Sequence, residues 1–328
     1  MVEVLELTAM PTALRLYAKA LAPGRRPHVK AGLPEREIRL IGHRSTVGEV
    51  SAYDQVCGFV LTDRLPATWL HVLTFPLQLT LMTAPGFPLG LAGLVHVSNS
   101  MVQHRPALVG EALDLSVRAE NLRPHRRGVL VDLVGEARVA GEPVWQGRSV
   151  YLNRQQTLAG APAGGETSRS RGPLAAGSGK QGGSGFDVEA QSSSLSSTVE
   201  PSSTPAGSPT GPDTATLHTA GWWRLPADLG RRYAAVSGDV NPIHLSAVAA
   251  RALGFPRTIA HGMCTHARVL ASLQARLPDA YEVSVDFLKP VLLPSTVRFA
   301  AAAQPHGHRA QLTNRTGDKV FLTLSLTG

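Results

Sequence analysis

The residues best suited to chemistry lie between Tyr233 and Met263. An acid, Asp239, and an imidazole, His244, stand five residues apart across an expected helix start. Asn241 has the side chain preferred at an N-cap and Pro242 the ring preferred at the first helical position, so His244 is expected in the first turn. The unpaired amides there favour an anionic carboxylate nearby and a neutral imidazole that can accept a proton. The pattern predicts an acid/base pair.

A second helix start follows. Gly254 can close the preceding helical segment in a left-handed conformation, and Pro256 prevents its continuation. From Met263 to Leu277, apolar or small residues recur at intervals of three and four, which predicts one buried helical face that ends before Pro278. The backbone N–H of Gly262 would lie at this N-terminus, where an amide without a side chain can stabilise a developing oxyanion.

Together the two motifs resemble the signature of the MaoC-like dehydratases, the (R)-specific enoyl-CoA hydratases of the hot-dog fold. The matching residues read S-G-D-V-N-P-I-H from Ser237 and I-A-H-G-M from Ile259, and the resemblance covers roughly Trp222 to Gly328. It implies that four residues carry catalysis: Asp239, His244, Asn241, which orders the loop and the water, and Gly262, which supplies the oxyanion-hole amide. It also implies substrate contacts from Ser237, Gly238, Phe255, His261 and Met263. The structural alternative is that Asp239 and Asn241 merely cap a helix and that His244 is a surface histidine.

Residues 36–154 look like a second, altered copy of the C-terminal half. Three pairs of segments recur in the same order: Tyr53–Phe59 with Tyr233–Asp239, Leu94–Ser98 with Ile259–Met263, and His104–Leu108 with Leu288–Leu292. Three such pairs indicate a duplicated unit. Phe59 replaces the acid in the first copy, and the Asn-Pro pair and the following histidine are missing, so this copy is not expected to run the chemistry. Its helix is expected to begin at Pro76. His71 and His96 could line a pocket, although packing is their commoner role.

Both halves also contain strands that alternate between apolar and polar residues, as in residues 113–117 and 283–287. Such strands pack one face on a partner, here the apolar helix of each half. We therefore predict an α+β fold of two tandem hot-dog units, each an antiparallel sheet wrapped around a long helix, forming an internal pseudo-dimer. The predicted domains are an N-terminal degenerate unit (1–154), a Gly/Ser/Pro-rich linker (155–216) and a C-terminal catalytic unit (217–328). The linker composition predicts flexibility.

Composition narrows the class of protein. The net charge of +8 suits a polyanionic partner such as the phosphates of coenzyme A. Nucleic acid is not predicted, because the arginine clusters at 25–26 and 123–127 are not interleaved with aromatic residues. No apolar run is long enough to predict a membrane span. Two distant cysteines give no disulfide framework, which favours the cytoplasm. His261, Cys264 and His266 do not complete a four-ligand cluster, so no metal is predicted.

The resemblance implies (R)-specific hydration of trans-2-enoyl-CoA, with dehydration of 3-hydroxyacyl thioesters as the reverse reaction. No cofactor is expected, since coenzyme A enters as part of the substrate, and the thioester could equally be carried by acyl carrier protein. Two alternatives remain: a hot-dog acyl-CoA thioesterase, which would release the free thiol, and a non-catalytic acyl-thioester-binding protein. The sequence leaves open the acyl chain, which member of the pair is the base, and whether the internal pair forms a homodimer.

Overall fold

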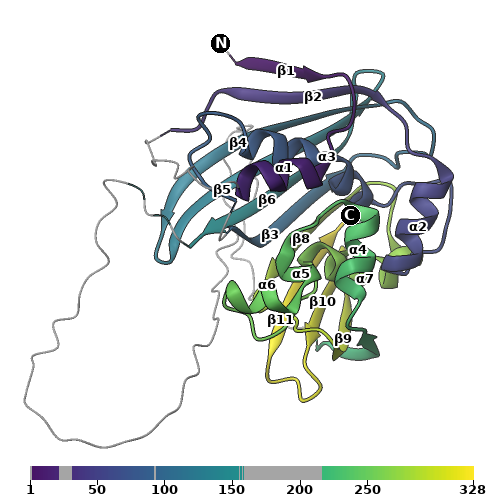
Figure 1. Cartoon of the computed structure of the whole chain (residues 1–328). Helices are drawn as coiled ribbons and strands as arrows, with labels where there is room; N and C mark the ends of the chain where they lie inside the picture. Colours follow the sequence, from purple (N-terminus) through teal and green to yellow (C-terminus); the bar gives the residue numbers. More distant parts are fainter. Residues whose placement is uncertain (1, 22–31, 92–93, 155, 157, 159–215) are drawn as a thin grey trace, which may run out of the picture.

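The computed structural model describes residues 2–21, 32–91, 94–154, 156, 158 and 216–328 (Figure 1). The elements of the N-terminal half are β1 (Glu3–Leu7), α1 (Ala13–Leu21), β2 (Arg36–His43), α2 (Val47–Cys57), α3 (Ala67–Met82), β3 (Leu94–Gln103), β4 (Leu113–His125), β5 (Gly128–Val139) and β6 (Glu142–Asn153). Those of the C-terminal half are β7 (His218–Leu225), α4 (Leu229–Ser237), α5 (Pro242–Leu245), α6 (Ala247–Ala252), α7 (Gly262–Leu273), a 3₁₀ turn (Gln274–Arg276), β8 (Tyr281–Phe287), β9 (Ser295–Gln304), β10 (Gly307–Thr313) and β11 (Val320–Thr327).

The strands form one sheet of eleven, in the order β1-β2-β4-β5-β6-β3-β8-β11-β10-β9-β7. Read from its outer edge inward, each half has the same connectivity: β2-β4-β5-β6-β3 in one and β7-β9-β10-β11-β8 in the other. The innermost strands of the two halves, β3 and β8, pair antiparallel in the middle, with Met101 opposite Val283. Neither inner edge is therefore exposed to another chain. The predicted α+β fold, a double hot-dog with an internal pseudo-dimer, is confirmed.

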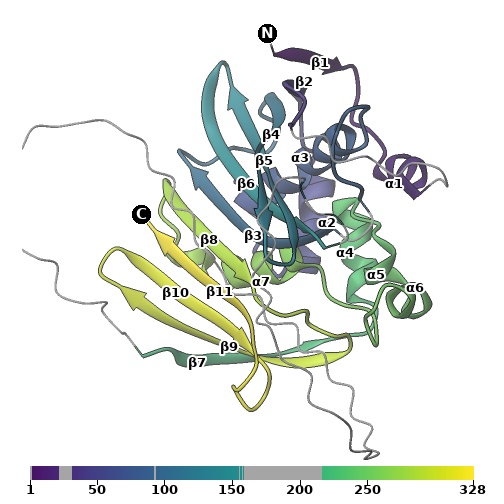
Figure 2. The same ribbon diagram turned by 90° about the vertical axis from the view of Figure 1, so that its left-hand side faces the viewer.

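Each half-sheet buries one face against its own helix. The strand β8 alternates between buried and exposed positions, and its buried residues Tyr281, Val283 and Val285 belong to the hydrophobic core. In the other half, α3 packs against β2, β4 and β5. Figure 2 shows the two groups of strands side by side, with the helices on one side of them. This alternation is the period-two pattern predicted from the sequence.

Two of the three predicted sequence pairs lie at equivalent places in the fold. The helices α2 and α4 both end at a glycine in the left-handed conformation, Gly58 with φ 88° and Gly238 with φ 71°. The helices pack together, with the Tyr53 and Tyr233 ring centroids 6.2 Å apart. In the third pair, Leu108 and Leu292 each form an isolated bridge to the residue three positions before the central helix of their half.

The second predicted pair, Leu94–Ser98 with Ile259–Met263, is wrong. His96 lies in β3, whereas His261 is the N-cap of α7. The isolated bridges equate Arg64 with Ile259, which places Pro66 and Ala67 at the positions of His261 and Gly262. The helix α3 accordingly begins at Ala67 and contains Pro76 in its interior. Because almost every residue of α3 is buried, no polar face marks its first turn in the sequence.

The segment before the repeat adds a strand and a helix. The strand β1 extends the sheet edge parallel to β2, and the helix α1 follows it. The helix α1 packs against α3, and in Figure 2 it lies on the same side of the molecule as α4, α5 and α6. A Cβ on Gly238 would lie 3.8 Å from the Cβ of Ala13, so α1 also contacts the turn before Asp239.

Two predictions concern the rest of the chain. The predicted linker, 155–216, lies outside the described residues except for 156, 158 and 216, so its flexibility and the domain boundaries stay predictions. In the part of the chain that the structure describes, no helix has both the length and the apolar composition needed to cross a membrane.

The close approach of α4 and α5 requires a glycine. A Cβ at Gly230 would lie 2.1 Å from the carbonyl oxygen of His244, which is backbone and cannot swing away. We expect Gly230→Ala to separate the two helices, to lower the free energy of unfolding by about 1–3 kcal/mol and to displace His244. Thermal unfolding and activity both measure this effect. The control is Gly48→Ala in the exposed first turn of α2, where the nearest atom is 4.0 Å away and stability should not fall. Equal effects of the two substitutions would contradict the packing argument.

Candidate active site

The acid and the imidazole are positioned by a tight turn between two helices. Gly238 closes α4, and Asn241 caps α5 by accepting a hydrogen bond from the amide of Ile243 at 3.3 Å. His244 lies in the first turn of α5, as predicted. The single helical segment expected up to Leu253 is instead divided at Ser246, whose extended backbone ends α5 and whose side chain caps α6.

The Asp239 carboxylate is held by two hydrogen-bond donors and lies beside the ring of His261. Its Oδ1 accepts a hydrogen bond from the Tyr17 hydroxyl at 2.8 Å and from the amide of Asn241 at 3.2 Å. Its Oδ2 lies 3.8 Å from Nε2 of His261. The amide of Asp239 itself donates to Oγ of Ser237. The orientation of the carboxylate is therefore fixed through Oδ1, while Oδ2 remains on the side of the imidazoles.

His244 is held in one tautomer by a backbone oxygen. Its Nδ1 lies 2.8 Å from the carbonyl oxygen of Ile259. A carbonyl can only accept, so Nδ1 carries the hydrogen and Nε2 of the neutral ring carries the lone pair. The ring is 8% exposed and lines the cavity described below. His244 is therefore arranged to accept a proton at Nε2.

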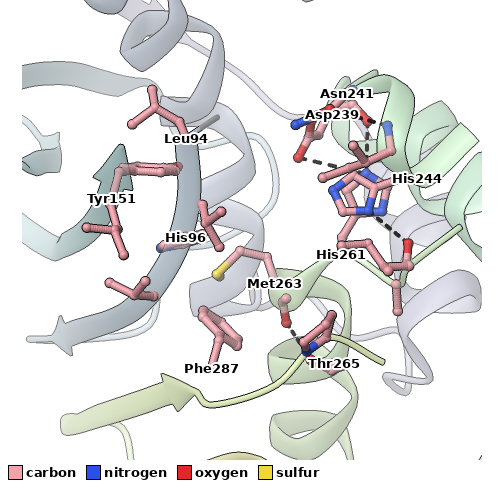
Figure 3. Close-up of a pocket in the computed structure, with 18 of the residues that line it drawn as sticks. Leu94, His96, Tyr151, Asp239, Asn241, His244, His261, Met263, Thr265 and Phe287 are labelled. Carbon is pink, nitrogen blue, oxygen red and sulfur yellow. Dashed lines mark hydrogen bonds and ion pairs between the residues drawn. The ribbon is translucent and has the colours of Figure 1, made fainter. Parts of the chain in front are cut away.

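His261 joins this pair. Its ring stacks on that of His244 with centroids 3.6 Å apart, and its Nε2 lies 3.0 Å from the backbone oxygen of Asp239. One side-chain atom of each of the three residues lies within 4.8 Å of the other two (Figure 3). Among the described residues this is the group that could hold a metal ion, but His244 Nδ1 and His261 Nε2 are already bound to carbonyl oxygens.

The protonation states follow from these surroundings. Burial favours the neutral form of Asp239, but four neighbours outweigh it and hold its pKa below the usual value: His261, His244, the Tyr17 hydroxyl and the Asn241 amide. Burial, followed by the neighbouring His261, lowers the pKa of His244 to about 3. At neutral pH the site therefore contains a carboxylate anion and a neutral imidazole. Both are proton acceptors, and a water molecule could donate to both.

Gly262 begins α7 beside this pair. The first amides of a helix have no partner within the helix, and the positive helix end favours negative charge there. A Cβ at Gly262 would lie 3.0 Å from Cε1 of Phe287, which is tighter than most such contacts. The Phe287 ring covers the position, and a side chain there would require that ring to shift. The carbonyl of Gly262 accepts a hydrogen bond from Oγ1 of Thr265 at 2.6 Å.

One cavity connects these groups with the N-terminal half. Asp239, His244, His261 and Gly262 line its polar end, and the wall opposite is built by α3, β3 and β6. The residues on that wall include Phe75, Leu79, Met82, Leu94, His96 and Tyr151. Figure 3 shows Leu94, His96 and Tyr151 facing the acid and the imidazoles across the cavity. The cavity is therefore an apolar channel with a polar end.

The residues predicted to contact substrate divide into two groups. Ser237, Phe255, His261 and Met263 line the cavity, whereas Gly238 forms the turn and is not among the lining residues. Their contact with a substrate stays a prediction. His71 and His96 both line the cavity. Tyr17 and Tyr151 also line it, and the sequence analysis missed both, because neither belongs to a motif.

Comparison with known proteins shows to which family the chain belongs. The MaoC like domain family model matches residues 205–321. The chain is 36% identical to 3-hydroxyacyl-thioester dehydratase X (HtdX) of Mycobacterium tuberculosis over 296 residues, which are 90% of this chain and 90% of that one. The chain belongs to the MaoC-like dehydratase family. It is accordingly an enzyme of the hydratase/dehydratase class, a hydro-lyase, as the sequence motifs predicted.

Solved structures of MaoC-like dehydratases share the whole double fold. The crystal structure of M. tuberculosis HtdX has a TM-score of 0.68 at 33% identity and covers 89% of this chain and 100% of that chain. A MaoC-like dehydratase from Phytophthora capsici has a TM-score of 0.62 at 14% identity, with coverage of 89% and 95%, and this likeness shows the fold alone. The MaoC-like match begins after the N-terminal half, so α1 and α3 lie outside it.

Three further histidines lie close together beside the cavity: His71 and His266 are buried, and His96 is partly buried. Burial lowers the pKa of His71 to about 4 and, together with the neighbouring His71, that of His266 to about 3. Burial and these two neighbours hold the pKa of His96 well below the usual value. His266 is fully buried in α7, and neither ring nitrogen has a hydrogen-bond partner among the described residues. All three therefore remain neutral in the folded protein at neutral pH.

This cluster makes stability depend on pH. The pKa of His266 is lower in the folded than in the unfolded chain, so its stabilising effect is complete above pH 6.5 and is lost as the pH falls toward 3. Lowering the pH from 8 to 5 should destabilise the wild type through His266 but not the His266→Leu variant. The difference in free energy of unfolding between the variant and the wild type should therefore change by about 2 kcal/mol in favour of the variant. Urea unfolding at the two pH values measures it. The exposed His306→Leu is the control. A difference from wild type that is equal at both pH values would refute this linkage.

Proposed function

We propose that this protein catalyses the (R)-specific hydration of trans-2-enoyl-CoA and, in reverse, the dehydration of 3-hydroxyacyl thioesters, without a cofactor. The observation that carries the proposal is the convergence of the Asp239 carboxylate, the His244 ring and the N-terminus of α7 on one cavity. The relative from M. tuberculosis is named as a 3-hydroxyacyl-thioester dehydratase, which supports the same substrate class. The thioester is carried by coenzyme A or by acyl carrier protein.

In the proposed reaction, the substrate carbonyl oxygen accepts a hydrogen bond from the amide of Gly262. Addition at the third carbon moves charge onto this oxygen and gives an enolate-like species. The amide and the positive end of α7 stabilise that charge more than they stabilise the neutral carbonyl, which lowers the barrier. Asn241 contributes by holding the turn that carries Asp239.

A water molecule between Asp239 and His244 supplies both parts of the addition. It loses a proton to the pair as its oxygen bonds to the third carbon and the carbon–carbon double bond opens. The same pair then returns that proton to the second carbon, so the atoms of one water are added and the pair is regenerated. Because the two groups share the proton closely, we assign the base to the pair. Delivery from one side of the substrate accounts for a single stereochemical outcome.

The acyl chain extends along the channel toward the N-terminal half. This half has Phe59 where the catalytic half has Asp239, and Pro66 where it has His261. The apolar residues of α3 and β3 are then available as a wall for a long or bulky acyl group. The N-terminal unit thus serves substrate binding and the C-terminal unit serves chemistry.

The first test is turnover of crotonyl-CoA and of a longer 2-enoyl-CoA. The loss of enoyl absorbance measures the rate, and chiral analysis identifies the product. We expect the (R)-3-hydroxyacyl-CoA. Asp239→Asn and His244→Gln should each lower kcat at least about a hundredfold, because each removes one proton acceptor. The exposed Asp63→Asn is the control. Release of free thiol would instead indicate the thioesterase alternative, and binding without turnover an acyl-thioester-binding protein.

The second test narrows the proposed channel. Leu94 lies in β3, is only partly buried and faces the cavity (Figure 3). We expect Leu94→Trp to lower kcat/KM for a long-chain enoyl-CoA by about tenfold and to leave crotonyl-CoA turnover nearly unchanged. Val248→Trp on α6, which is 75% exposed, is the control. A wild-type enzyme strictly limited to four-carbon substrates, or an equal loss with both substrates, would count against the channel.

A further inference from the structure

Tyr17 reaches the active site from outside the duplicated unit. It belongs to α1, which precedes the repeat and lies far from the MaoC-like match at residues 205–321. Its hydroxyl donates a hydrogen bond to Oδ1 of Asp239 at 2.8 Å across a separation of 222 residues. Tyr17 also lines the cavity. A segment with no chemical motif of its own therefore contacts the proposed catalytic acid directly.

The hydrogen bond from Tyr17 determines which carboxylate oxygen of Asp239 is left to bind other groups. Oδ1 of Asp239 has two donors, the Tyr17 hydroxyl and the Asn241 amide, while Oδ2 is 3.8 Å from the His261 ring. The Asn241 amide lies within the same turn and can hold the carboxylate at one point only. A second donor on the same oxygen fixes the rotation of the carboxylate plane. Oδ2 is then left to receive the water in the proposed reaction.

The helix that carries Tyr17 is fixed in place. Ala13, one turn earlier in α1, is 6% exposed and belongs to the hydrophobic core. It also contacts the turn at Gly238, and α1 packs against α3. The helix thus touches the N-terminal unit on one side and the Asp239 turn on the other. This packing determines where the hydroxyl lies without requiring a substrate.

We propose that Tyr17 is a positioning residue for Asp239. The N-terminal helix α1, which lies outside the C-terminal unit, contributes it to that unit within the same chain. The inference rests on the proposed function, because it assigns to Tyr17 the task of orienting the acid of that reaction. Tyr17 donates to Oδ1, keeps Oδ2 directed toward His244 and His261, and favours the ionised carboxylate. Without its hydroxyl the carboxylate keeps one fixed donor and can rotate away from the water.

The chemistry of the phenol suits this task. Burial and the neighbouring Asp239 raise the pKa of Tyr17, so the hydroxyl keeps its proton and acts as a donor throughout the working range of pH. A hydrogen bond from a neutral donor to an anion is stronger than one between neutral groups. The other titratable groups that face Asp239 are His261, His244, His71, Tyr151 and Tyr233. Tyr17→Phe substitutes none of these residues, and of them Tyr151 also interacts with Tyr17.

The test is Tyr17→Phe, which keeps the ring and removes the hydroxyl. We expect kcat for crotonyl-CoA to fall about tenfold with a smaller change in KM, because the donor acts on the acid and not on the substrate. The pKa of Asp239 should rise when a donor to its anion is lost. The acidic limb of kcat/KM should therefore move to higher pH. In the Asp239→Asn background, Tyr17→Phe should cause no comparable further loss.

A second measurement does not depend on turnover. In protein labelled with ¹³C at the aspartate carboxyl groups, the Asp239 signal is identified by its absence in Asp239→Asn. Its titration should move to higher pH in Tyr17→Phe and stay in place in the control Tyr281→Phe, a buried tyrosine of β8 outside the cavity lining. An unshifted Asp239 titration overturns the inference, whatever the enzyme turns over. Wild-type kinetics in Tyr17→Phe also overturn the inference, but they leave the proposed function intact. A shifted Asp239 titration in a protein that hydrates no enoyl thioester would instead refute the proposed function and support the contact between Tyr17 and Asp239.

Discussion

A carboxylate largely withdrawn from water needs hydrogen-bond donors, and the candidate active site depends on this requirement. The Asp239 carboxylate accepts hydrogen bonds from two parts of the chain, its own turn and α1, and its Oδ2 lies 3.8 Å from the ring of His261 at the start of α7. Each donor also restricts where that part of the chain can lie. The N-terminal segment, the helix α4 and the helix α7 are thus brought together at one acid.

The two imidazoles, His244 and His261, are held by hydrogen bonds to backbone oxygens. The carbonyl of Ile259 selects the tautomer of His244, and the carbonyl of Asp239 binds the ring of His261. The rings stack at 3.6 Å, so neither can turn without moving the other. Burial keeps both neutral, and a neutral imidazole beside an anionic carboxylate can accept a proton from one water. Backbone contacts therefore decide the tautomer and the orientation of the imidazoles, and burial decides that they stay neutral.

The two halves share a fold but differ at equivalent sites. In the N-terminal half, the residue after the glycine that closes α2 is Phe59, and the loop that follows is bound by Gln274 at the end of α7. Both hydrogen bonds of that amide go to the backbone of Val60, at 2.8 and 2.9 Å. The polar groups of this second loop are thus used for packing between the halves. Its helix α3 is instead an apolar wall of the cavity.

The sequence by itself determined the local geometry of the candidate catalytic motif and the general architecture. Asp239, Asn241 and His244 lie within six residues, and helix capping fixes their relative positions, so local spacing predicted their geometry. Period-two alternation likewise predicted the strands, and the recurrence of Tyr53 and Gly58 predicted the duplication. These features depend on contacts between residues close in the chain, for which sequence spacing is a direct measure of distance.

Only the tertiary structure decided the remaining features. The start of α3 could not be predicted because its residues are buried on all sides, and His96 was aligned wrongly because a strand and a helix start can share a short apolar sequence. Tyr17 gave no signal, since its partner is 222 residues away and a single tyrosine in an amphipathic segment has no distinctive spacing. Contacts between distant segments arise from how whole helices pack, which local pattern does not record.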